Sequence, residues 1–409
     1  MKDNNNKKKK KSARLSQKKW LRTRHKVVRL LLNLPFGTYV RLKYRIKVEK
    51  FREQKKRPYL VLFNHQTGFD QFFVSMAFDR PVYFVASDDI FTNGFSSSLI
   101  KYLVAPIPIK KQSADITAVM NCIRVAREGG TIALAPEGNR TFGGSPCHMN
   151  DAIVPLARKL GMPILLYRIE GGYGVHPRWS DRVRKGGMRA YVSRVIEPEE
   201  YANMTNDELF LAIKDGLHTV EGRGEKSYPD KRCAEYIERA LYTCPVCGMT
   251  ELYSEGRTVT CKKCGGSVTV NDDMTLTGDN LPFGNVGEWY DWQSAYINSI
   301  DPRTLGDGPL HTGVCSLYRV VPNTKKQLVA DNIPLSLYSN RIEVGDLTLP
   351  FEGTSVVTVL GKNKLNVYHG DKVYQIKSDK RFCALRYVNI FYRVKNLTKE
   401  NENDGFLGL

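Results

Sequence analysis

The chain has 409 residues, of which 42% are hydrophobic, and this length allows two or three domains that each bury a core. The formal net charge is +20, and residues 1–57 supply almost all of it, with 22 Lys or Arg against three acidic residues. The other 352 residues are nearly neutral. This distribution excludes a protein that is basic throughout and assigns the charge to one segment.

The basic segment combines positive charge with large apolar side chains. Lys7–Lys11 form a run of lysines, and the apolar side chains follow at mostly helical spacing among Lys and Arg. This combination is typical of a helix on an anionic membrane surface, whereas a soluble tail followed by a helix packed on its own domain is the alternative. We expect residues 1–57 to bind an anionic membrane. The apolar positions are Trp20, Leu21, Val27, Val28, Leu31 and Leu34.

No stretch of the sequence reaches the ~20 apolar residues that a membrane-spanning helix needs, and no secretory signal is recognisable near its start. Four of the nine cysteines fall into two Cys-x-x-Cys pairs and the others are scattered, so no disulfide framework is expected. We therefore expect a peripheral protein on the cytoplasmic face of a membrane.

Short apolar runs alternate with helix-period segments between residues 58 and 222. This alternation predicts an α/β domain with a mostly parallel sheet flanked by helices, in which functional side chains collect at strand ends. Strands are expected at 59–63, 82–86, 131–135, 163–169 and 189–195, and helices near 70–78, 114–128, 150–160 and 205–220.

The stretch Asn64–Asp70 directly follows the first expected strand. His65 is a candidate general base because imidazole titrates near neutral pH, and Asp70 is close enough in sequence to hold it in one tautomer. Thr67 and Asp70 also fit a capping box that opens a helix. The stretch alone leaves both interpretations open.

A second group of polar side chains follows the strand at 131–135. Glu137, Gly138 and Arg140 place a carboxylate, a flexible glycine and a guanidinium on one tight loop. Arginine suits phosphate because its planar fork donates two hydrogen bonds to adjacent oxygens, although a surface turn with a Glu and Arg pair is the alternative. Lys110-Lys111, before the expected helix at 114–128, would add a cation at a strand end.

These segments together resemble the glycerolipid acyltransferase family, the bacterial 1-acylglycerol-3-phosphate acyltransferases. The resemblance covers about residues 25–222, and His65 and Glu137 are 72 residues apart, as is usual in that family. The family motif Asn-His-x4-Asp is matched by Asn64, His65 and Asp70, and Glu-Gly-Thr-Arg is matched by Glu137, Gly138 and Arg140.

Three positions depart from the family pattern. Asn139 replaces the usual Thr, Lys111 stands where the second motif has Arg, and Leu166 replaces a Pro of the fourth motif. Lysine keeps the positive charge but loses the bidentate geometry of arginine. Acyl transfer is still expected despite these departures, but they leave the identity of the acceptor open.

The resemblance implies direct acyl transfer, in which His65 deprotonates an acceptor hydroxyl that attacks an acyl thioester while Asp70 orients the imidazole. Arg140 and Lys111 would hold the phosphate of 1-acylglycerol-3-phosphate (lysophosphatidic acid), and backbone N–H groups near Gly138 would receive the oxyanion. Glu137 would position Arg140 or an acceptor hydroxyl. The donor is expected to be acyl-CoA or acyl carrier protein, with no redox or nucleotide cofactor. The implied substrate-binding residues are Asn64, Lys111, Glu137, Gly138, Asn139 and Arg140.

Two cysteine pairs predict a structural zinc site. Cys244 and Cys247 form the first pair, Cys261 and Cys264 form the second, and a Gly follows each. Four thiolates close a tetrahedral site, so the zinc would be structural, whereas unligated cysteines are the alternative. Similar ribbons bind nucleic acid, but residues 242–280 are not notably basic, so nucleic acid is not expected as a partner.

The sequence after residue 281 predicts a small antiparallel β-rich domain with a helix at 382–397, in outline like a pleckstrin-homology module. Trp289 and Trp292 are expected in its core. The predicted organisation is a basic arm (1–57), a catalytic domain (58–222), a linker helix near 230–241 with the zinc ribbon (223–280), the β-rich domain (281–398) and a flexible tail (399–409).

Two other functions fit the same residues less well. One keeps the fold and changes the acceptor to another lysophospholipid or a lipid alcohol. The other is a non-catalytic zinc-ribbon protein that binds nucleic acid or a regulatory partner, and the presence of both His65 and Asp70 argues against it.

Overall fold

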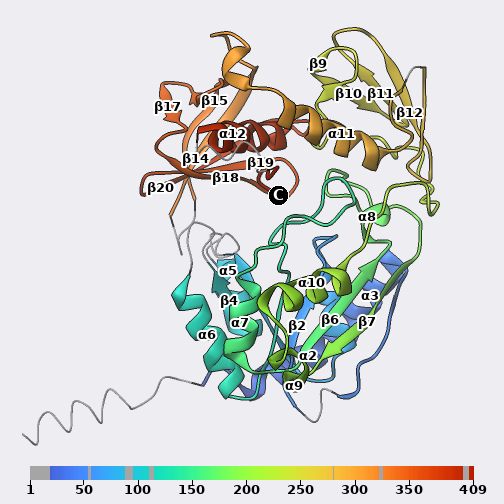
Figure 1. The fold of residues 1–409 in the computed structure, drawn as a ribbon, viewed down its shortest axis with the longest axis vertical. Helices are drawn as coiled ribbons and strands as arrows, with labels where there is room; N and C mark the ends of the chain where they lie inside the picture. Colours follow the sequence, from blue (N-terminus) through green and yellow to red (C-terminus); the bar gives the residue numbers. More distant parts are fainter. Residues whose placement is uncertain are drawn as a thin grey trace, which may run out of the picture.

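The computed structural model of the chain describes residues 19–53, 57–87, 95–109, 115–279, 281–321, 326–398 and 405–409. Lys7–Lys11 and Lys110-Lys111, which the sequence assigns to membrane and phosphate binding, lie outside these residues. Figure 1 shows two parts stacked along the long axis, with the amino-terminal α/β part below and the ribbon and β-rich part above.

The amino-terminal part is built on a seven-stranded sheet with the order β1-β7-β6-β2-β5-β3-β4. Strands β6, β2, β5, β3 and β4 run parallel, whereas β7 is antiparallel to β6 and β1 runs with β7. This topology confirms the predicted mostly parallel α/β class. The strands are β1 (Ile46–Val48), β2 (Leu60–Phe63), β3 (Val82–Ser87), β4 (Ile107–Ile109), β5 (Thr131–Leu134), β6 (Ile164–Glu170) and β7 (Met188–Ile196).

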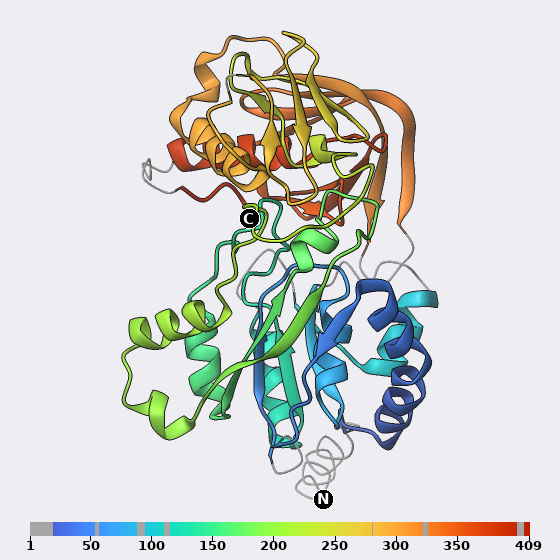
Figure 2. The same cartoon turned by 90° about the vertical axis from the view of Figure 1, so that its right-hand side faces the viewer.

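The sheet is buried on both faces. In β2, Leu60 and Leu62 pack into one apolar cluster, whereas Val61 and Phe63 pack into another. Successive side chains of a strand point to opposite faces, so a strand covered on both sides needs a continuous apolar run. Figure 2 shows helices on both sides of the sheet. They are α2 (Thr23–Asn33), α3 (Pro35–Tyr44), α4 (Asp70–Ala77), α5 (Phe95–Val104), α6 (Ile116–Arg127), α7 (Ile153–Leu160), α8 (Gly172–Val175), α9 (Pro198–Ala202) and α10 (Asn206–Leu217).

The longest helix in the described part of the chain, Ala384–Thr398, has 15 residues. None of the helices there combines the length and the apolar character that crossing a membrane requires.

The ribbon consists of the sheet β10-β11-β12-β13 beside the short hairpin β8–β9. The helix predicted near residues 230–241 is wrong, because only Ile237–Arg239 (η3) forms a helical turn. Tyr236 has a φ of +70°, which is outside the helical region. Its backbone N–H, which a helix would pair with a carbonyl four residues earlier, donates instead to Ser254 Oγ of the ribbon at 2.7 Å. The strands are β8 (Thr243–Cys244), β9 (Gly248–Met249), β10 (Leu252–Glu255), β11 (Thr258–Cys261), β12 (Ser267–Val270) and β13 (Leu276–Thr277).

The β-rich part is a second seven-stranded sheet with the order β17-β16-β15-β14-β20-β19-β18, and all its pairs are antiparallel. Helix α12 (Ala384–Thr398) contacts β18 and β19. The predicted antiparallel β-rich region is confirmed, and its likeness to a pleckstrin-homology module stays a prediction. Its other elements are α11 (Val286–Ser299), η4 (Pro302–Thr304), β14 (His311–Val320), β15 (Gln327–Leu337), β16 (Arg341–Val344), β17 (Leu347–Pro350), β18 (Thr354–Leu360), β19 (Lys364–His369) and β20 (Lys372–Lys377).

One apolar cluster extends across the ribbon, the β-rich part and loops of the amino-terminal part. It includes Val259 of β11, Leu365 of β19 and Trp179, and Trp289 of α11 is buried in it as expected. The predicted boundary between residues 280 and 281 thus separates elements that share a core. The division into domains stays a prediction.

The expectation of a flexible tail is wrong for residues 405–409. Leu407 is buried, and its carbonyl accepts a hydrogen bond from Asn389 Nδ2 of α12 at 2.7 Å. The Phe406 ring lies 4.9 Å from the ring centre of His148, whose N–H donates to Leu409 O at 3.3 Å. These apolar residues bury surface at the junction of the two parts, where Figure 1 marks the C-terminal end.

Candidate active site

His65 and Asp70 lie at the carboxyl end of β2, where the chain turns into α4. His65 Nδ1 is 2.8 Å from Asp70 Oδ2. The imidazole is 25% exposed, whereas the carboxylate is completely buried. Because Nδ1 faces the carboxylate, Nε2 is the ring nitrogen left for a substrate.

The Asp70 carboxylate is held by more than the imidazole. Oδ2 accepts from Gln66 N at 2.8 Å, Oδ1 accepts from Thr67 Oγ1 at 2.7 Å, and Thr67 N lies 3.0 Å from both oxygens. Asp70 is also the first residue of α4, where negative charge is favourable. The predicted capping box with Thr67 as the N-cap is not formed, because the N-cap of α4 is Phe69. The Asp70 carboxylate nevertheless serves both the start of the helix and the dyad.

Glu137 ties the loop after β5 to the loop after β2. Its Oε1 accepts from His65 N at 3.3 Å, and its Oε2 accepts from Cys147 N at 2.9 Å. Burial raises the pKa of Glu137 to about 7, although both bonds oppose the shift. The described contacts of this carboxylate are backbone N–H groups and not the Arg140 guanidinium, so of the two expected roles the positioning of an acceptor hydroxyl stays a prediction.

Asn64, which was expected to bind substrate, joins two strands instead. Its Nδ2 donates to Ile169 O at 2.8 Å, and its Oδ1 accepts from Ile169 N at 2.7 Å. The side chain is buried. Both ends of the amide thus continue the pairing of β2 with β6 beyond the last residue of β2, which gives Asn64 a structural role.

Two buried side chains that the sequence analysis missed hold the glycine-rich loop after β6. Gln66 Oε1 accepts from Gly172 N at 2.8 Å. The Glu221 carboxylate accepts from the N–H groups of Gly171 and Tyr173, the latter at 3.0 Å, and burial raises its pKa to about 7. The glycine cluster was a signal for a functional loop, but no local pattern marks Glu221, which follows Gly171 by 50 residues.

Arg140 lies against the loop that carries the dyad. A Cβ added to Gly68 would come within 3.4 Å of Arg140 Nη1, so the guanidinium lies beside the residues between His65 and Asp70. Burial lowers the pKa of Arg140, and the charge of Asp70 opposes that shift. Nη2 donates to Gly361 O of the β-rich part at 3.2 Å.

The other residues implied by the resemblance have different outcomes. Gly138 is exposed, has a φ of +66° and donates its N–H to Ala135 O at 3.0 Å. This turn uses the N–H group of Gly138 itself, and the expectation that backbone N–H groups around Gly138 receive an oxyanion stays a prediction. Asn139 is half-buried in the same loop, and Lys111 lies outside the described residues.

A buried pair that the sequence did not single out flanks Arg140. Tyr44 Oη and His176 Nδ1 are 3.2 Å apart. Burial, together with the positive charges of Lys362 and Arg140, lowers the pKa of His176 to about 3. Cations from both parts of the molecule therefore meet beside a neutral imidazole.

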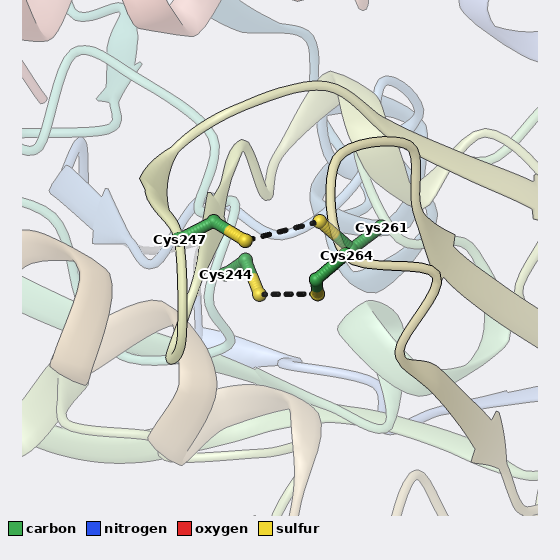
Figure 3. Close-up of side chains that lie close together, drawn as sticks. All are labelled: Cys244, Cys247, Cys261 and Cys264. Carbon is green, nitrogen blue, oxygen red and sulfur yellow. Dashed lines mark hydrogen bonds between the residues drawn. The ribbon is translucent and has the colours of Figure 1, made fainter.

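The four cysteines of the two pairs converge (Figure 3). Their Sγ atoms all lie within 4.8 Å of one another, with 3.8 Å between Cys244 and Cys264 and 3.9 Å between Cys247 and Cys261. A tetrahedron with Zn–S bonds of ~2.3 Å has edges of roughly 3.8 Å. The four thiols therefore fit a closed, structural zinc site.

Residues 45–169 match the acyltransferase family model, and this range contains the dyad, Glu137 and Arg140. These residues form an acyltransferase-family domain. The match spans 125 of the 409 residues and confirms that the motifs are those of an acyltransferase. No curated protein matches the chain. Among solved structures, the chain is similar to the 1-acyl-sn-glycerophosphate (LPA) acyltransferase PlsC from Thermotoga maritima, with 20% identity, 47% of this chain and 76% of that chain covered, and a TM-score of 0.39.

Proposed function

We propose that this acyltransferase moves a fatty acyl group from an acyl thioester, acyl-CoA or acyl carrier protein, to the hydroxyl of 1-acylglycerol-3-phosphate and so forms phosphatidic acid. The observation that carries the proposal is the His65–Asp70 pair, 2.8 Å apart within the range that matches the family. A base held in one tautomer, with Arg140 beside it, suits acylation of an alcohol that carries a phosphate.

In the proposed reaction, the acceptor hydroxyl gives its proton to His65 Nε2 as its oxygen attacks the thioester carbonyl. The C–S bond then breaks, the new C–O bond remains in the ester, and the imidazolium returns the proton to the leaving thiolate. Asp70 keeps the other ring proton on Nδ1 and stabilises the charged ring. Its fixed hydrogen bonds mean that little rearrangement accompanies the charge change.

Arg140 is the side chain proposed to hold the acceptor phosphate. Its Nη1 lies beside Gly68, on the loop that carries the base, and a second cation is near, because Lys43 Nζ is 5.8 Å from the centre of the Phe69 ring. Planar guanidinium donors match phosphate oxygens bidentately. Lys111 and Asn139 remain predicted contributors to this site.

A lipid acceptor requires a membrane-facing surface, and the proposed one lies on α2, α3 and α5. Helix α2 contacts α3 and α5, and apolar side chains on all three are exposed, with Leu34 80% and Leu42 74% accessible. Exposed apolar side chains of this number mark an interaction surface. They are Val27, Leu30, Leu31, Leu34, Tyr39, Leu42, Leu99, Ile100, Tyr102 and Val104.

A cationic pocket of about 300 Å³ near this surface supports binding to anionic lipid. Lys19, Arg22, Arg24 and Lys101 line it. Trp20 forms part of its wall and donates from Nε1 to Ala105 O at 3.0 Å, so this indole packs on the protein rather than facing the membrane as expected. The four positive charges suit the phosphate of a lipid headgroup. We therefore propose peripheral binding to the cytoplasmic face of a membrane.

The zinc proposed for the four cysteines would hold the ribbon together. All four positions of the tetrahedron are taken by thiolates, so the ion has no site for a substrate. Its contribution is to the fold of residues 243–277, and acyl transfer is left to the amino-terminal part.

The test of the proposed function is transfer from acyl-CoA to 1-acylglycerol-3-phosphate by the full chain. His65→Ala is expected to abolish transfer without unfolding the protein, whereas His218→Ala, which changes an exposed histidine after α10, should leave it intact. Unchanged turnover in His65→Ala would contradict the proposal.

Arg140→Ala distinguishes the acceptor class. It should reduce transfer to phosphate-bearing acceptors far more than transfer to lipid alcohols, and an equal loss for both would remove Arg140 from phosphate binding. A panel of lysophospholipids and lipid alcohols, assayed with one acyl-CoA, identifies the preferred acceptor. RNA binding at physiological salt without turnover on any acceptor would instead favour the non-catalytic alternative.

A further inference from the structure

The turn between β18 and β19, residues 361–363, reaches from the β-rich part to the site around Arg140. The Gly361 carbonyl accepts from two guanidinium groups, Arg140 Nη2 at 3.2 Å and Arg178 Nε at 2.9 Å. Val359 O accepts from Arg178 Nη2 at 2.9 Å. A single turn thus bonds to two arginines that precede it by about 200 residues in sequence.

The side chains of the other two residues of the turn also form hydrogen bonds. Lys362 Nζ lies 2.9 Å from Asp181 Oδ1 and donates to Ser180 O at 2.5 Å. Asn363 Nδ2 donates to Asp379 O at 3.0 Å within the β-rich part. The position of the Gly361 carbonyl is therefore fixed from both parts of the molecule.

Arg178 connects the turn to the loop after β5. It is buried, donates from Nη1 to Arg140 O at 2.8 Å and lies 4.2 Å from the centre of the Phe142 ring. Arg140 is thus held twice, through its carbonyl by Arg178 and through its guanidinium by Gly361. Long side chains lose substantial rotamer entropy when they are ordered, so a guanidinium that is ordered in advance binds its ligand more tightly.

Assuming the proposed function, we propose that the β18–β19 turn completes the acceptor-phosphate site, with the Gly361 carbonyl acting as a positioning group for Arg140. The bond to Gly361 uses one of the five N–H donors of the guanidinium and leaves the rest for phosphate oxygens. The β-rich part thereby contributes to recognition of the acceptor, and the acyltransferase domain alone has an incomplete phosphate site.

Gly361 allows a test that acts on the backbone without a steric clash. Its φ is +70°, and an added Cβ would meet no atom within 4 Å. Valine strongly disfavours this conformation, whereas asparagine tolerates it. Gly370, in the β19–β20 turn of the same sheet, has a φ of +56° and is equally open. Gly370→Val therefore introduces the same kind of strain away from Arg140.

The expected result is a KM for 1-acylglycerol-3-phosphate that rises about tenfold or more in Gly361→Val, the scale of one lost hydrogen bond to a charged group, with a smaller change in kcat. Gly370→Val should stay near the wild-type KM, and Gly361→Asn should raise KM less than Gly361→Val because asparagine tolerates a positive φ. In an Arg140→Ala background, Gly361→Val should have little further effect. Equal KM values for Gly361→Val and Gly370→Val, or additive effects with Arg140→Ala, would overturn the proposal.

A second measurement separates this inference from the proposed function. Phenylglyoxal labels accessible arginines, and peptide mass spectrometry reports the extent of labelling at Arg140. Labelling should increase in Gly361→Val and not in Gly370→Val, and unchanged labelling would refute the contact. Absence of transfer to any lysophospholipid by the wild-type protein would instead refute the proposed function, and the labelling would still decide whether the turn positions Arg140.

Discussion

The Asp70→Asn variant distinguishes a proton-transfer dyad from a helix start. Asparagine has the shape of aspartate but carries one acceptor oxygen and one NH2 donor. In the structure both carboxylate oxygens accept hydrogen bonds, Oδ1 from Thr67 Oγ1 and Oδ2 from His65 and Gln66 N. In either orientation, the new NH2 group therefore faces donors.

The orientation of the amide decides the catalytic effect. With its NH2 group towards Thr67, the hydroxyl at Oγ1 can turn to accept from it, and only the negative charge beside His65 is lost. With its NH2 group towards His65, that group also meets the fixed Gln66 N–H, and the imidazole must move its proton from Nδ1 to Nε2 in order to accept from it. This tautomer has no free base at Nε2, and the corresponding change in serine-protease triads lowers kcat by about 10⁴. In this second orientation we expect a loss of about 10³–10⁴ in kcat. Stability should fall by about 2–5 kcal/mol because bonds to a buried charged acceptor are lost.

Thr67→Val is the matched control, because it leaves the carboxylate in place and removes the 2.7 Å bond from Thr67 Oγ1 to it, together with the 3.1 Å bond from Phe69 N to the same hydroxyl. It should cost about 1–3 kcal/mol of stability and change kcat by less than about tenfold. Thiol release from acyl-CoA reports kcat, and urea unfolding reports stability. Equal losses of kcat in the two variants would show that Asp70 acts only as the start of α4.

Three further perturbations test the zinc, a buried carboxylate and the membrane surface. Cys261→Ser should lower the zinc content from one ion per chain to near zero and the Tm by at least about 5 °C, and an unchanged Tm would contradict a structural metal. Glu221→Gln removes a carboxyl group whose pKa burial raises from 4.5 to about 7. Between these pH values the folded wild-type protein holds a proton on Glu221 that the unfolded chain has released, so the wild-type protein loses stability as pH rises through the interval. Glu221→Gln lacks this loss. The free energy of unfolding of the variant, measured with urea and compared with that of the wild type, should therefore increase by up to about 3 kcal/mol between pH 5 and pH 8. A constant difference would refute the shift. Leu31→Ser should weaken flotation with anionic liposomes, whereas Leu211→Ser, at a similarly exposed leucine on α10, should not.

The parts of the fold that could be predicted from the sequence depend on short-range patterns. The apolar run at 59–63 forms a strand as predicted. A strand that is covered on both faces of its sheet has no solvent-facing positions, so all its residues can be apolar. His65 and Asp70 are five residues apart, so the turn into α4 alone brings them together. The cysteine pairs converge for a similar reason, because glycines with positive φ make each knuckle turn.

The features that could not be predicted depend on contacts between distant residues. The Asn64 amide meets Ile169, which is 105 residues away, and Arg140 meets Gly361 across 221 residues. No periodicity encodes which backbone group a side chain will reach. The same reason explains the incorrect helix near 230–241, where Tyr236 N–H bonds to the ribbon, and the tail, where Leu407 finds a buried position.

Asp181 links the ribbon to the turn that positions Arg140. Its carboxylate pairs with Lys362 at 2.9 Å and with Arg239, which precedes the first cysteine pair, at 2.8 Å. Burial opposes ionisation of Asp181, but the bonds from Arg239 and Lys362 hold its pKa below the ordinary value. Arg239 is buried and also donates to Trp179 O at 2.7 Å, so it cannot follow Lys362 if the pair separates.

Asp181→Asn should therefore loosen the turn while leaving the ribbon intact. The amide keeps the shape of the carboxylate but removes the charge that holds both cations. We expect the KM for 1-acylglycerol-3-phosphate to rise by only about threefold to tenfold, because the Gly361 carbonyl keeps its bonds to two arginines. The zinc content should not change. Asp230→Asn, which breaks the 2.9 Å pair between Arg182 and another carboxylate, is the control. An unchanged KM in Asp181→Asn would show that the ribbon and the acceptor site are independent.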